Sequence, residues 1–347
     1  MNVLPLDIEK PHKVTKEFLN KSGLCGINNL GNTCFMNSII QCLNHMIPLS
    51  TYFLENTFKK DLNTSSDCYD IAIQWNIVVR GLWHRNSVIS PGNFHKAVQQ
   101  LAFTKGFTDF TGFGQNDSHE FMQFFLESLH NSVSRKVNMS IVGEAKNELD
   151  RMAINSLKYW KRFFQDDYSP IIDIFYGQHL SKLLKITNGK TKVSYTYDPF
   201  SCLSLEVSPK YSTIYDCLDS FTSKEKLSDE TGPNKVYKTI SFWKLPKILM
   251  VFFKRFDNNN TKLNNHIDFP LENLDMSKYV FGYNKSESIY NLVAVSNHAG
   301  GCNGGHYFAY CRNADDNWYK FDDNVVSTLS SSRVVSSAAY CLFYILK

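Results

Sequence analysis

The separation of two hydrophobic patterns along the chain constrains the fold more than any other feature of the sequence. Over residues 34–47 apolar side chains recur at the spacing of an amphipathic helix, and further helices are predicted over 117–130 and about 144–164. From residue 171 onward, polar loops separate short runs of β-forming residues. Strands are expected at residues 201–207, 235–243, 248–253, 290–297, 307–312, 318–321 and 340–346. Helices first and strands later are typical of an α+β architecture rather than of alternating βαβ units.

Length and composition place the chain among globular proteins. Its 347 residues allow one large domain or two smaller ones, and no repeat or Pro/Gly/Ser-rich linker divides it. Hydrophobic residues make up 43% and charged residues 20%, which excludes a disordered protein. The first 20 residues are polar and carry two prolines. We therefore expect residues 1–22 to be a loosely held N-terminal extension.

Charge and hydropathy restrict the classes of partner. The 37 Lys and Arg residues and 33 Asp and Glu residues give a net charge of +4, and the basic residues occur in scattered doublets, which gives nucleic-acid binding little support. The longest apolar run, residues 338–346, is about half the length of a membrane span. The N-terminus has no basic segment followed by an apolar one, so no secretory signal is expected. These features predict a soluble intracellular protein, located in the cytoplasm and also in the nucleus, that binds neither nucleic acid nor membrane.

The nine cysteines are expected to be free thiols, because their number is odd and the predicted compartment is reducing. No two of them are three residues apart, so the sequence contains no Cys-x-x-Cys zinc motif. Most should be small buried hydrophobic residues. Cys34 has a different setting, because it begins the first predicted helix. The helix dipole is expected to lower the pKa of its thiol. Asn29, Gly31 and Asn32 precede it on a turn whose backbone N–H groups and Asn amides are expected to face a developing oxyanion.

A cysteine nucleophile needs a base and a group that orients the base. His306 stands in the sequence Gly-Gly-His-Tyr-Phe-Ala-Tyr (304–310), where it is expected to open a strand. Sixteen residues later, the strand predicted at 318–321 ends in Asp322 and Asp323. Antiparallel pairing of the two strands would place Asp322 near His306 and fix the imidazole tautomer. The alternative is a packed core cysteine, a surface histidine and a turn carboxylate with no common role.

Four segments resemble the ubiquitin-specific proteases, in the right order over about residues 23–347. Gly-Ile-Asn-Asn-Leu-Gly-Asn-Thr-Cys-Phe-Met-Asn-Ser (26–38) is similar to the cysteine box of that family. Gly-Gly-His-Tyr-Phe-Ala-Tyr with Trp-Tyr-Lys-Phe-Asp-Asp-Asn-Val-Val-Ser (318–327) is similar to its histidine box. Gly-Gln-Asn-Asp-Ser-His-Glu-Phe (114–121) resembles its Gln-Asp-x-x-Glu-Phe segment, and Leu-Met-Val-Phe-Phe-Lys-Arg-Phe (249–256) resembles its long palm strand.

The resemblance implies a papain-like cysteine protease fold with three subdomains. The thumb would span about residues 23–170, the fingers about 171–240 and the palm about 241–347. Cys34 would be the nucleophile and His306 the general base and acid, and Asp322 would orient His306. The resemblance makes Asn29 the oxyanion donor and gives Asp323 a supporting role.

The same resemblance assigns residues to the substrate. Asp117 and Glu120 would hold the arginine-containing tail of ubiquitin, and Gly305 and Tyr307 would line its path. From spacing alone a second interpretation stays open, in which Asp117 caps its helix and Glu120 reaches back as in a capping box. Neutral neighbours, Gln115 among them, would leave Asp117 available for substrate by supplying that cap instead.

One departure from the family concerns its structural zinc. Many members hold the fingertips with two Cys-x-x-Cys pairs, but residues 183–187 and 233–238, where these pairs would stand, contain no cysteine. Between residues 171 and 243 the only Cys and His residues are His179, Cys202 and Cys217, which are too scattered for a zinc ribbon. We therefore expect no metal and no cofactor, with hydrogen bonds and aromatic packing holding the fingers together.

The function that these expectations favour is deubiquitination. A thiol-dependent hydrolase would cleave the bond between the C-terminal glycine of ubiquitin and a lysine amine through a Cys34 thioester. Its partners would be ubiquitin and ubiquitinated proteins, and it would act as a monomer. Two alternatives stay open: a pseudoenzyme that binds ubiquitin without efficient cleavage, and a hydrolase of a ubiquitin-like modifier.

Overall fold

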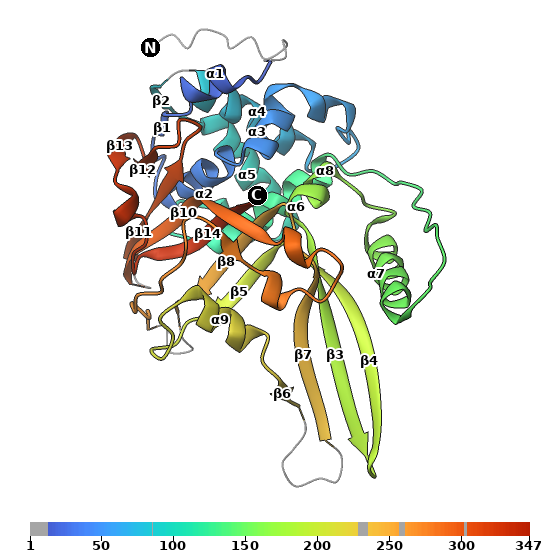
Figure 1. Cartoon of the computed structure of the whole chain (residues 1–347). Coiled ribbons are helices and arrows are strands. Elements are labelled where there is room, and N and C mark those ends of the chain that lie inside the picture. Colours follow the sequence, from blue (N-terminus) through green and yellow to red (C-terminus); the bar gives the residue numbers. More distant parts are fainter. Residues whose placement is uncertain (1–12, 85, 228–234, 257–260, 302–303) are drawn as a thin grey trace.

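Helices occupy most of the first half of the described chain and strands most of the second (Figure 1). A computed structural model describes residues 13–84, 86–227, 235–256, 261–301 and 304–347. The helices are α1 (Lys16–Asn20), α2 (Cys34–Asn44), α3 (Ile47–Leu54), α4 (Tyr69–His84), α5 (Gly92–Lys105), α6 (Ser118–Ser132), α7 (Glu148–Phe164), α8 (Pro170–Phe175) and α9 (Ile214–Phe221).

The strands form a large central sheet, a sheet of long strands that projects from it, and one short parallel pair (Figure 1). They are β1 (Gly26–Ile27), β2 (Val88–Ile89), β3 (Gly177–Thr187), β4 (Lys190–Phe200), β5 (Cys202–Glu206), β6 (Glu225–Lys226), β7 (Lys235–Lys244), β8 (Ile248–Lys254), β9 (Leu274–Asp275), β10 (Ile289–Gly301), β11 (Gly304–Arg312), β12 (Trp318–Asp322), β13 (Val325–Leu329) and β14 (Ala339–Leu346). The expected α+β fold is confirmed.

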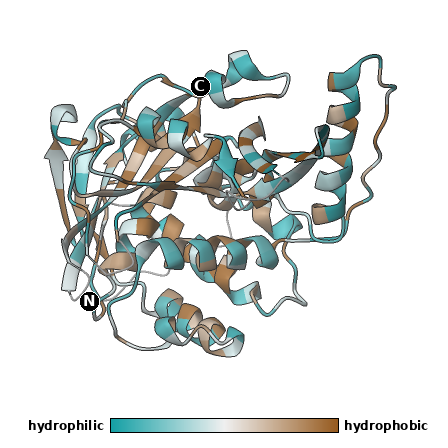
Figure 2. Ribbon diagram, turned by 90° about the horizontal axis from the view of Figure 1, so that it is seen from below, coloured by the Kyte–Doolittle hydropathy of each residue, from teal (hydrophilic) through white to brown (hydrophobic). Residues whose placement is uncertain are grey.

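The central sheet has the strand order β13-β12-β11-β10-β14-β8-β5, and β9 pairs with β10. Both of its faces are covered, which explains the unbroken apolar run of β8. Ile248 and Met250 face the core beneath the thumb helices, whereas Leu249, Val251 and Phe253 face a second core that includes α9. Hydrophobic residues accordingly concentrate on the central strands, and hydrophilic ones on the outer sides of the helices (Figure 2).

Helix α2 lies between the thumb helices and the central sheet, and every one of its residues is buried. It packs on β10 and β11 on one side and on α6 on the other. Its polar side chains bond to neighbouring elements: Gln41 donates to the carbonyl oxygen of Cys25 at 2.8 Å, and the hydroxyls of Ser38 and Ser296 lie 2.9 Å apart. These buried bonds fix the rotation of α2 about its axis, and with it the direction of its N-terminus.

The projecting sheet, which we call the fingers, has the order β4-β3-β7-β6. Strands β3 and β4 form a continuous antiparallel ladder from Gly177–Phe200 to Thr187–Lys190, closed by Asn188-Gly189 with both residues at positive φ. This two-residue Asn-Gly loop matches the right-handed twist of the strands. At the base of the fingers, helix α7 covers a cluster formed by Met152, Leu180, Tyr197 and Trp243.

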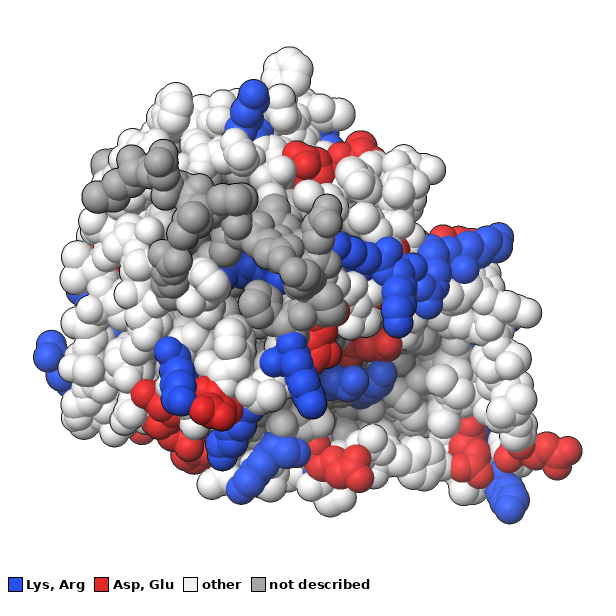
Figure 3. Space-filling model, turned by 90° about the horizontal axis from the view of Figure 1, so that it is seen from above, with Lys and Arg blue, Asp and Glu red and all other residues white. Residues whose placement is uncertain are grey.

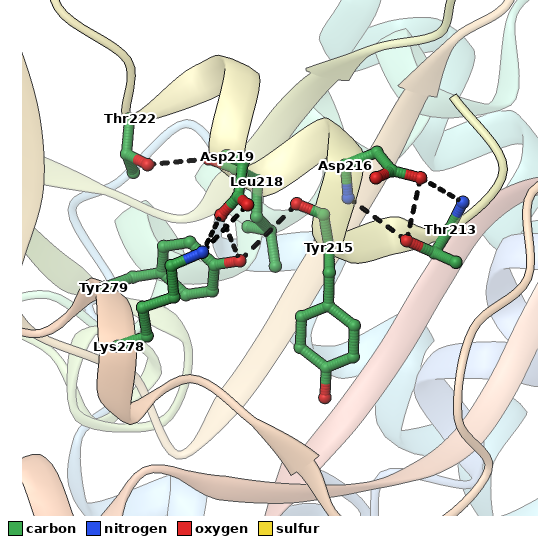
Figure 4. A network of polar contacts seen from close by, with 8 residues as sticks. All are labelled: Thr213, Tyr215, Asp216, Leu218, Asp219, Thr222, Lys278 and Tyr279. Atoms are coloured by element: carbon green, nitrogen blue, oxygen red, sulfur yellow. Dashed lines mark hydrogen bonds and ion pairs between the residues drawn. The ribbon is translucent and has the colours of Figure 1, made fainter. Parts of the chain in front are cut away.

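Polar contacts hold helix α9 at its start and along its length (Figure 4). Thr213 accepts from the backbone N–H of Asp216, whose carboxylate accepts from Thr213 in return, which completes a capping box. Further along the helix, Asp219 accepts from Nζ of Lys278 at 2.6 Å and from the hydroxyl of Tyr279 at 2.7 Å. The helix is thereby capped at its start and tied to the loop after β9.

Several expected boundaries differ from the structure. The helix predicted over 34–47 ends at Asn44, and a separate helix follows because Pro48 favours a new first turn. The helix predicted from about residue 144 begins at Glu148, where Asn147 and Asp150 cap each other's backbone. The sequence patterns do not predict α4, α5, α9 or the long hairpin of β3 and β4.

The sequence predicts an N-terminal extension over residues 1–22. Residues 1–12 of it lie outside the described residues. In the part that follows, α1 packs against the rest of the protein through two apolar side chains. Leu19 is buried, and the ring of Phe18 lies 6.3 Å from that of Trp83. These two apolar residues sit side by side in α1, so burying them attaches the segment to the thumb.

Charged side chains of both signs are interspersed over the face seen in Figure 3, without an extended area of one sign among the described residues. No helix in the described parts of the chain is long and apolar enough to cross a membrane. Within the same parts, no group of three or more His, Cys, Asp or Glu side chains is placed to hold a metal ion.

The three potential zinc ligands of the fingers region are used in packing. His179 stacks on Phe200 with ring centroids 4.1 Å apart, and burial lowers its pKa to about 4. Cys202 lies in β5, and Cys217 is buried on α9. Residues 233 and 234, part of one segment where the zinc cysteines of the family would stand, lie outside the described residues.

The fingers should fold without metal, because the β3–β4 ladder and the aromatic cluster under α7 supply their contacts. We expect EDTA to leave the melting temperature unchanged, with EDTA presaturated with calcium as the control, and metal analysis to find no stoichiometric zinc. One tightly bound zinc per chain, or a chelator-dependent fall in melting temperature, would show that the fingers need a metal.

Candidate active site

The turn before α2 is organised by one side chain. The amide oxygen of Asn29 accepts from the backbone N–H groups of Gly31 at 3.0 Å and Thr33 at 3.1 Å. Both Gly31 and Asn32 have positive φ, so the chain reverses tightly before Cys34 begins the helix. The hydroxyl of Thr33 accepts from the N–H of Leu30 at 2.9 Å, which closes the turn. The amide nitrogen of Asn29 is thereby held in one orientation close to the helix start.

Cys34 is the first residue of α2 and is 5% exposed. Burial raises the pKa of its thiol, and the carboxylate of Asp323 adds to the rise, whereas a hydrogen bond from the backbone of Tyr307 opposes it. The backbone N–H groups of Cys34 and Phe35 at the helix start lower this pKa as expected, but the net change is a rise. Desolvation outweighs the dipole because the thiol lies in the packed junction between α2 and β11.

His306 and Asp322 meet as the antiparallel pairing predicts. Strands β11 and β12 pair in register from Ala309–Phe321 to Arg312–Trp318, and Nε2 of His306 lies 2.6 Å from Oδ1 of Asp322. The expected strand boundary is wrong, because β11 already begins at Gly304 and His306 lies within it. Pairing of Gly304 and Gly305 with the end of β10 extends the strand. With Nε2 engaged by Asp322, Nδ1 is the ring nitrogen that remains, and no described contact joins it to the Cys34 thiol.

Asp323 occupies the two-residue turn between β12 and β13, at φ 48°. One carboxylate oxygen accepts from the amide of Asn29 at 2.9 Å and the other from the amide of Asn37 at 2.8 Å. Its backbone oxygen accepts from the N–H of Ile27 at 2.9 Å. Asp323 therefore joins the turn before Cys34, helix α2 and the β12–β13 hairpin. Sequence reasoning did not identify Asn37, which lies one helical turn after the cysteine.

A cavity of about 220 Å³ opens beside the thiol. Its lining comes from the Cys34 turn, from the segment before α6 and from the β10–β11 hairpin: Asn32, Cys34, Phe35, Gln115, Asn116, Asp117, Phe256, His298, Gly301, Gly305 and Tyr307. The side chain of Gln115 reaches across to Gly305, accepting from its N–H at 3.3 Å and donating to its carbonyl oxygen at 3.4 Å. These are the two backbone groups that an extended peptide would pair with.

Only glycine fits at position 305. A Cβ atom there would lie 2.1 Å from Nε2 of His298 and 2.8 Å from the carbonyl oxygen of Ala299. Burial lowers the pKa of His298 to about 4, so this imidazole is neutral at physiological pH. His298 belongs to the cavity wall although no sequence motif points to it. A surface without a side chain at this position lets another backbone approach closely.

Asp117 caps helix α6, with one carboxylate oxygen accepting from the N–H groups of His119 and Glu120. Its other oxygen accepts from the hydroxyls of Tyr307, at 3.3 Å, and Tyr340. The expectation that Gln115 or another neutral neighbour supplies the cap is therefore wrong. Among the described contacts Glu120 makes no reciprocal bond to Asp117. The carboxylate of Asp117 connects the thumb to strands β11 and β14, and Tyr307 is committed to that contact.

Glu120 faces a groove of about 710 Å³ whose other acidic side chains are Asp109, Glu127 and Asp167. Burial, and after it the carboxylates of Asp117 and Asp109, raises the pKa of Glu120. An approaching cation would relieve this repulsion. The groove therefore favours a basic ligand. Glu120, one of its acidic groups, lies three residues after Asp117, which lines the cavity beside the thiol.

Comparison with protein families identifies one match. The profile described as "Ubiquitin carboxyl-terminal hydrolase" matches residues 25–344, which is most of the chain. Ubiquitin carboxyl-terminal hydrolase 2 of Homo sapiens is 35% identical over 342 residues, covering 93% of this chain and 55% of that protein. The protein of the same name from Gallus gallus is 36% identical over 342 residues, covering 93% of each.

Solved structures show the same likeness. The SAGA Ubp8/Sgf11/Sus1/Sgf73 DUB module bound to ubiquitin aldehyde contains a chain that matches with a TM-score of 0.72 and 27% identity. The match covers 95% of this chain and 70% of that one.

With the bovine protein named ubiquitin carboxyl-terminal hydrolase 2, the identity is 34%, and the match spans 57% of that protein's length. The chain thus spans little more than half the length of several curated relatives.

Proposed function

Since this chain belongs to the ubiquitin carboxyl-terminal hydrolase family, we propose that it is a deubiquitinase that uses Cys34 as its nucleophile. The reaction would be hydrolysis of the bond between the C-terminal glycine of ubiquitin and a lysine amine. One observation carries the proposal: Cys34 borders the same cavity as Gly305 and Tyr307, the two neighbours of His306. His306 is already bonded to Asp322.

The first half of the reaction follows from the protonation states. The Cys34 thiol is neutral at rest because burial raises its pKa, so it needs a base at the moment of attack. His306 would take the thiol proton on Nδ1 while sulfur forms a bond to the glycine carbonyl carbon. The imidazolium would then give that proton to the lysine nitrogen as the carbon–nitrogen bond breaks, leaving a thioester on Cys34. Asp322 stabilises the imidazolium through Nε2.

The second half repeats the proton transfer with water. His306 would take a proton from water as the water oxygen attacks the thioester carbon, and would return it to sulfur as the carbon–sulfur bond breaks, which releases the C-terminal glycine as a carboxylic acid that then ionises. In both halves the carbonyl oxygen becomes an oxyanion. The contact with Asp323 uses one N–H of the Asn29 amide, and the second N–H is the donor proposed for this oxyanion.

Recognition of the substrate tail would divide between the cavity and the acidic groove. Gly305 offers backbone groups to a Gly-Gly peptide once Gln115 moves away. Arginines preceding that peptide would reach Glu120 in the groove, where a bidentate contact with a carboxylate is favourable. Asp117 would contribute indirectly, because both of its carboxylate oxygens are engaged in capping and in bonds to tyrosines.

Two alternatives differ from this proposal in one property each. A ubiquitin-binding pseudoenzyme would keep the cavity but lack turnover, and the assembled His306–Asp322 pair and the organised Asn29 turn support activity instead. A hydrolase of a ubiquitin-like modifier would share the Gly-Gly recognition. The monomeric state and the cytoplasmic and nuclear location stay predictions, which sedimentation and fluorescence microscopy would test.

We expect Cys34 to form a covalent adduct with ubiquitin that carries an electrophile at its C-terminus. The adduct should be absent from Cys34→Ala and retained by Cys202→Ala, which removes a partly exposed thiol of raised pKa (about 12) outside the cavity. Intact mass spectrometry reports both results. An undiminished adduct with Cys34→Ala, or none with the wild type, would refute the assignment of the nucleophile.

Replacing Glu120 with Ala separates the two roles considered for this residue. Asp117 is the residue that caps the helix. We therefore expect Glu120→Ala to raise KM for ubiquitin substrates roughly ten- to a hundredfold, which corresponds to about 1.5–3 kcal/mol of binding free energy. The melting temperature should be nearly unchanged. Asp70→Ala is the matched control, since Asp70 is also an acidic residue in the first turn of an exposed helix start. A lower melting temperature with wild-type KM would assign Glu120 to helix stability instead.

A further inference from the structure

The carboxylate of Asp322 has a second partner on its own strand. Oδ1 faces Nε2 of His306 at 2.6 Å, while Oδ2 lies 2.7 Å from Nζ of Lys320. Lys320 and Asp322 are two residues apart in β12, so the period of the strand puts both side chains on the same face. Each oxygen of the carboxylate therefore has its own donor, and the two contacts together determine its orientation.

Lys320 is itself held by the neighbouring strand. Its ammonium group lies 4.6 Å from the ring centroid of Phe308, a cation–π distance. Phe308 follows His306 by two residues in β11, and the two rings are stacked with centroids 6.5 Å apart. The four side chains thus form a square on one face of the β11–β12 pair. About a third of the Lys320 side chain is exposed (34%), and Asp322 is similar (31%).

We propose that Lys320 is a positioning residue for the hydrolysis described above: it holds the Asp322 carboxylate with one oxygen toward His306 and neutralises part of its charge. The kinetic effect expected from this inference rests on the proposed function. The effect expected in NMR rests on the geometry alone. Without Lys320, Oδ2 would be free to rotate toward His306 or solvent. The uncompensated carboxylate would also stabilise the imidazolium more strongly.

The charges around the pair are consistent with this role. Burial alone would raise the pKa of Asp322, but hydrogen bonds from Lys320 and from His306 outweigh it, so the pKa lies below its usual value. From β10, His298 lies opposite Tyr307, the neighbour of His306, and is neutral at physiological pH because burial lowers its pKa to about 4. From α2, Cys34 is neutral at rest because its pKa is raised. Asp323 accepts hydrogen bonds from Asn29 and Asn37. Among the described residues, Lys320 is the cation that contacts Asp322.

The test compares Lys320→Gln with Lys320→Arg. Removing the cation should leave the Asp322 carboxylate to stabilise the imidazolium more strongly, so the acid limb of the pH profile of kcat/KM should move upward in pH by about half a unit to one unit. At the foot of that limb kcat/KM should fall about three- to tenfold, and Lys320→Arg should restore most of it. Lys105→Gln is the matched control, because it breaks a surface ion pair, with Asp67, at a similarly exposed lysine (30%).

A titration of the His306 imidazole by NMR gives a readout that does not depend on turnover. Its midpoint should rise in Lys320→Gln and return toward wild type in Lys320→Arg. Unchanged midpoints would overturn the proposal even if the wild type is active, and an inactive wild type with shifted midpoints would overturn the proposed function alone. A lower melting temperature in Lys320→Gln without any shift of midpoint or pH profile would make Lys320 a structural residue only.

Discussion

The carboxylate of Asp323 is the contact on which the arrangement of the site depends. It accepts from Asn29 and Asn37 and so connects the turn before Cys34, the nucleophile helix and the β12–β13 hairpin. Asp322 immediately precedes it, so the same hairpin carries the group that orients His306. Because Asp322 and Asp323 are adjacent, one hairpin of the central sheet contacts both the Asn29 turn and the His306 imidazole. The thumb and the palm meet in a single junction at this point.

Burial decides how that junction can react. A helix N-terminus favours a thiolate, but the thiol of Cys34 lies in a packed interface where desolvation raises its pKa. A neutral thiol resists adventitious oxidation and alkylation, since the thiolate is the reactive form. In the proposed mechanism the activation of this thiol therefore falls to His306, which Asp322 already contacts in this structure. Gln115 spans the cavity to Gly305 in the same state, so the peptide path is narrow as well as organised.

Local patterns predicted those parts of the fold in which neighbouring residues share a role. Helical spacing identified α2 and α6, and two short β-like runs, the second ending in Asp322 and Asp323, indicated the strand pair that brings Asp322 to His306. The β3–β4 hairpin was not predicted because its lysines interrupt the apolar alternation, although Asn188-Gly189 is a strong hairpin signal. Contacts such as Gln115 with Gly305 join residues 190 positions apart, and the desolvation of Cys34 depends on the whole junction, so neither is visible in local spacing.

Turnover of an isopeptide-linked ubiquitin tests most directly whether this junction is a working hydrolase. Release of ubiquitin from a lysine side chain should be measured for the wild type and for Cys34→Ala, together with the binding of the same conjugate. We predict multiple turnovers by the wild type, and binding without release by Cys34→Ala. Binding without release by the wild type would contradict the assignment and favour a ubiquitin-binding pseudoenzyme, and continued release by Cys34→Ala would place the chemistry elsewhere.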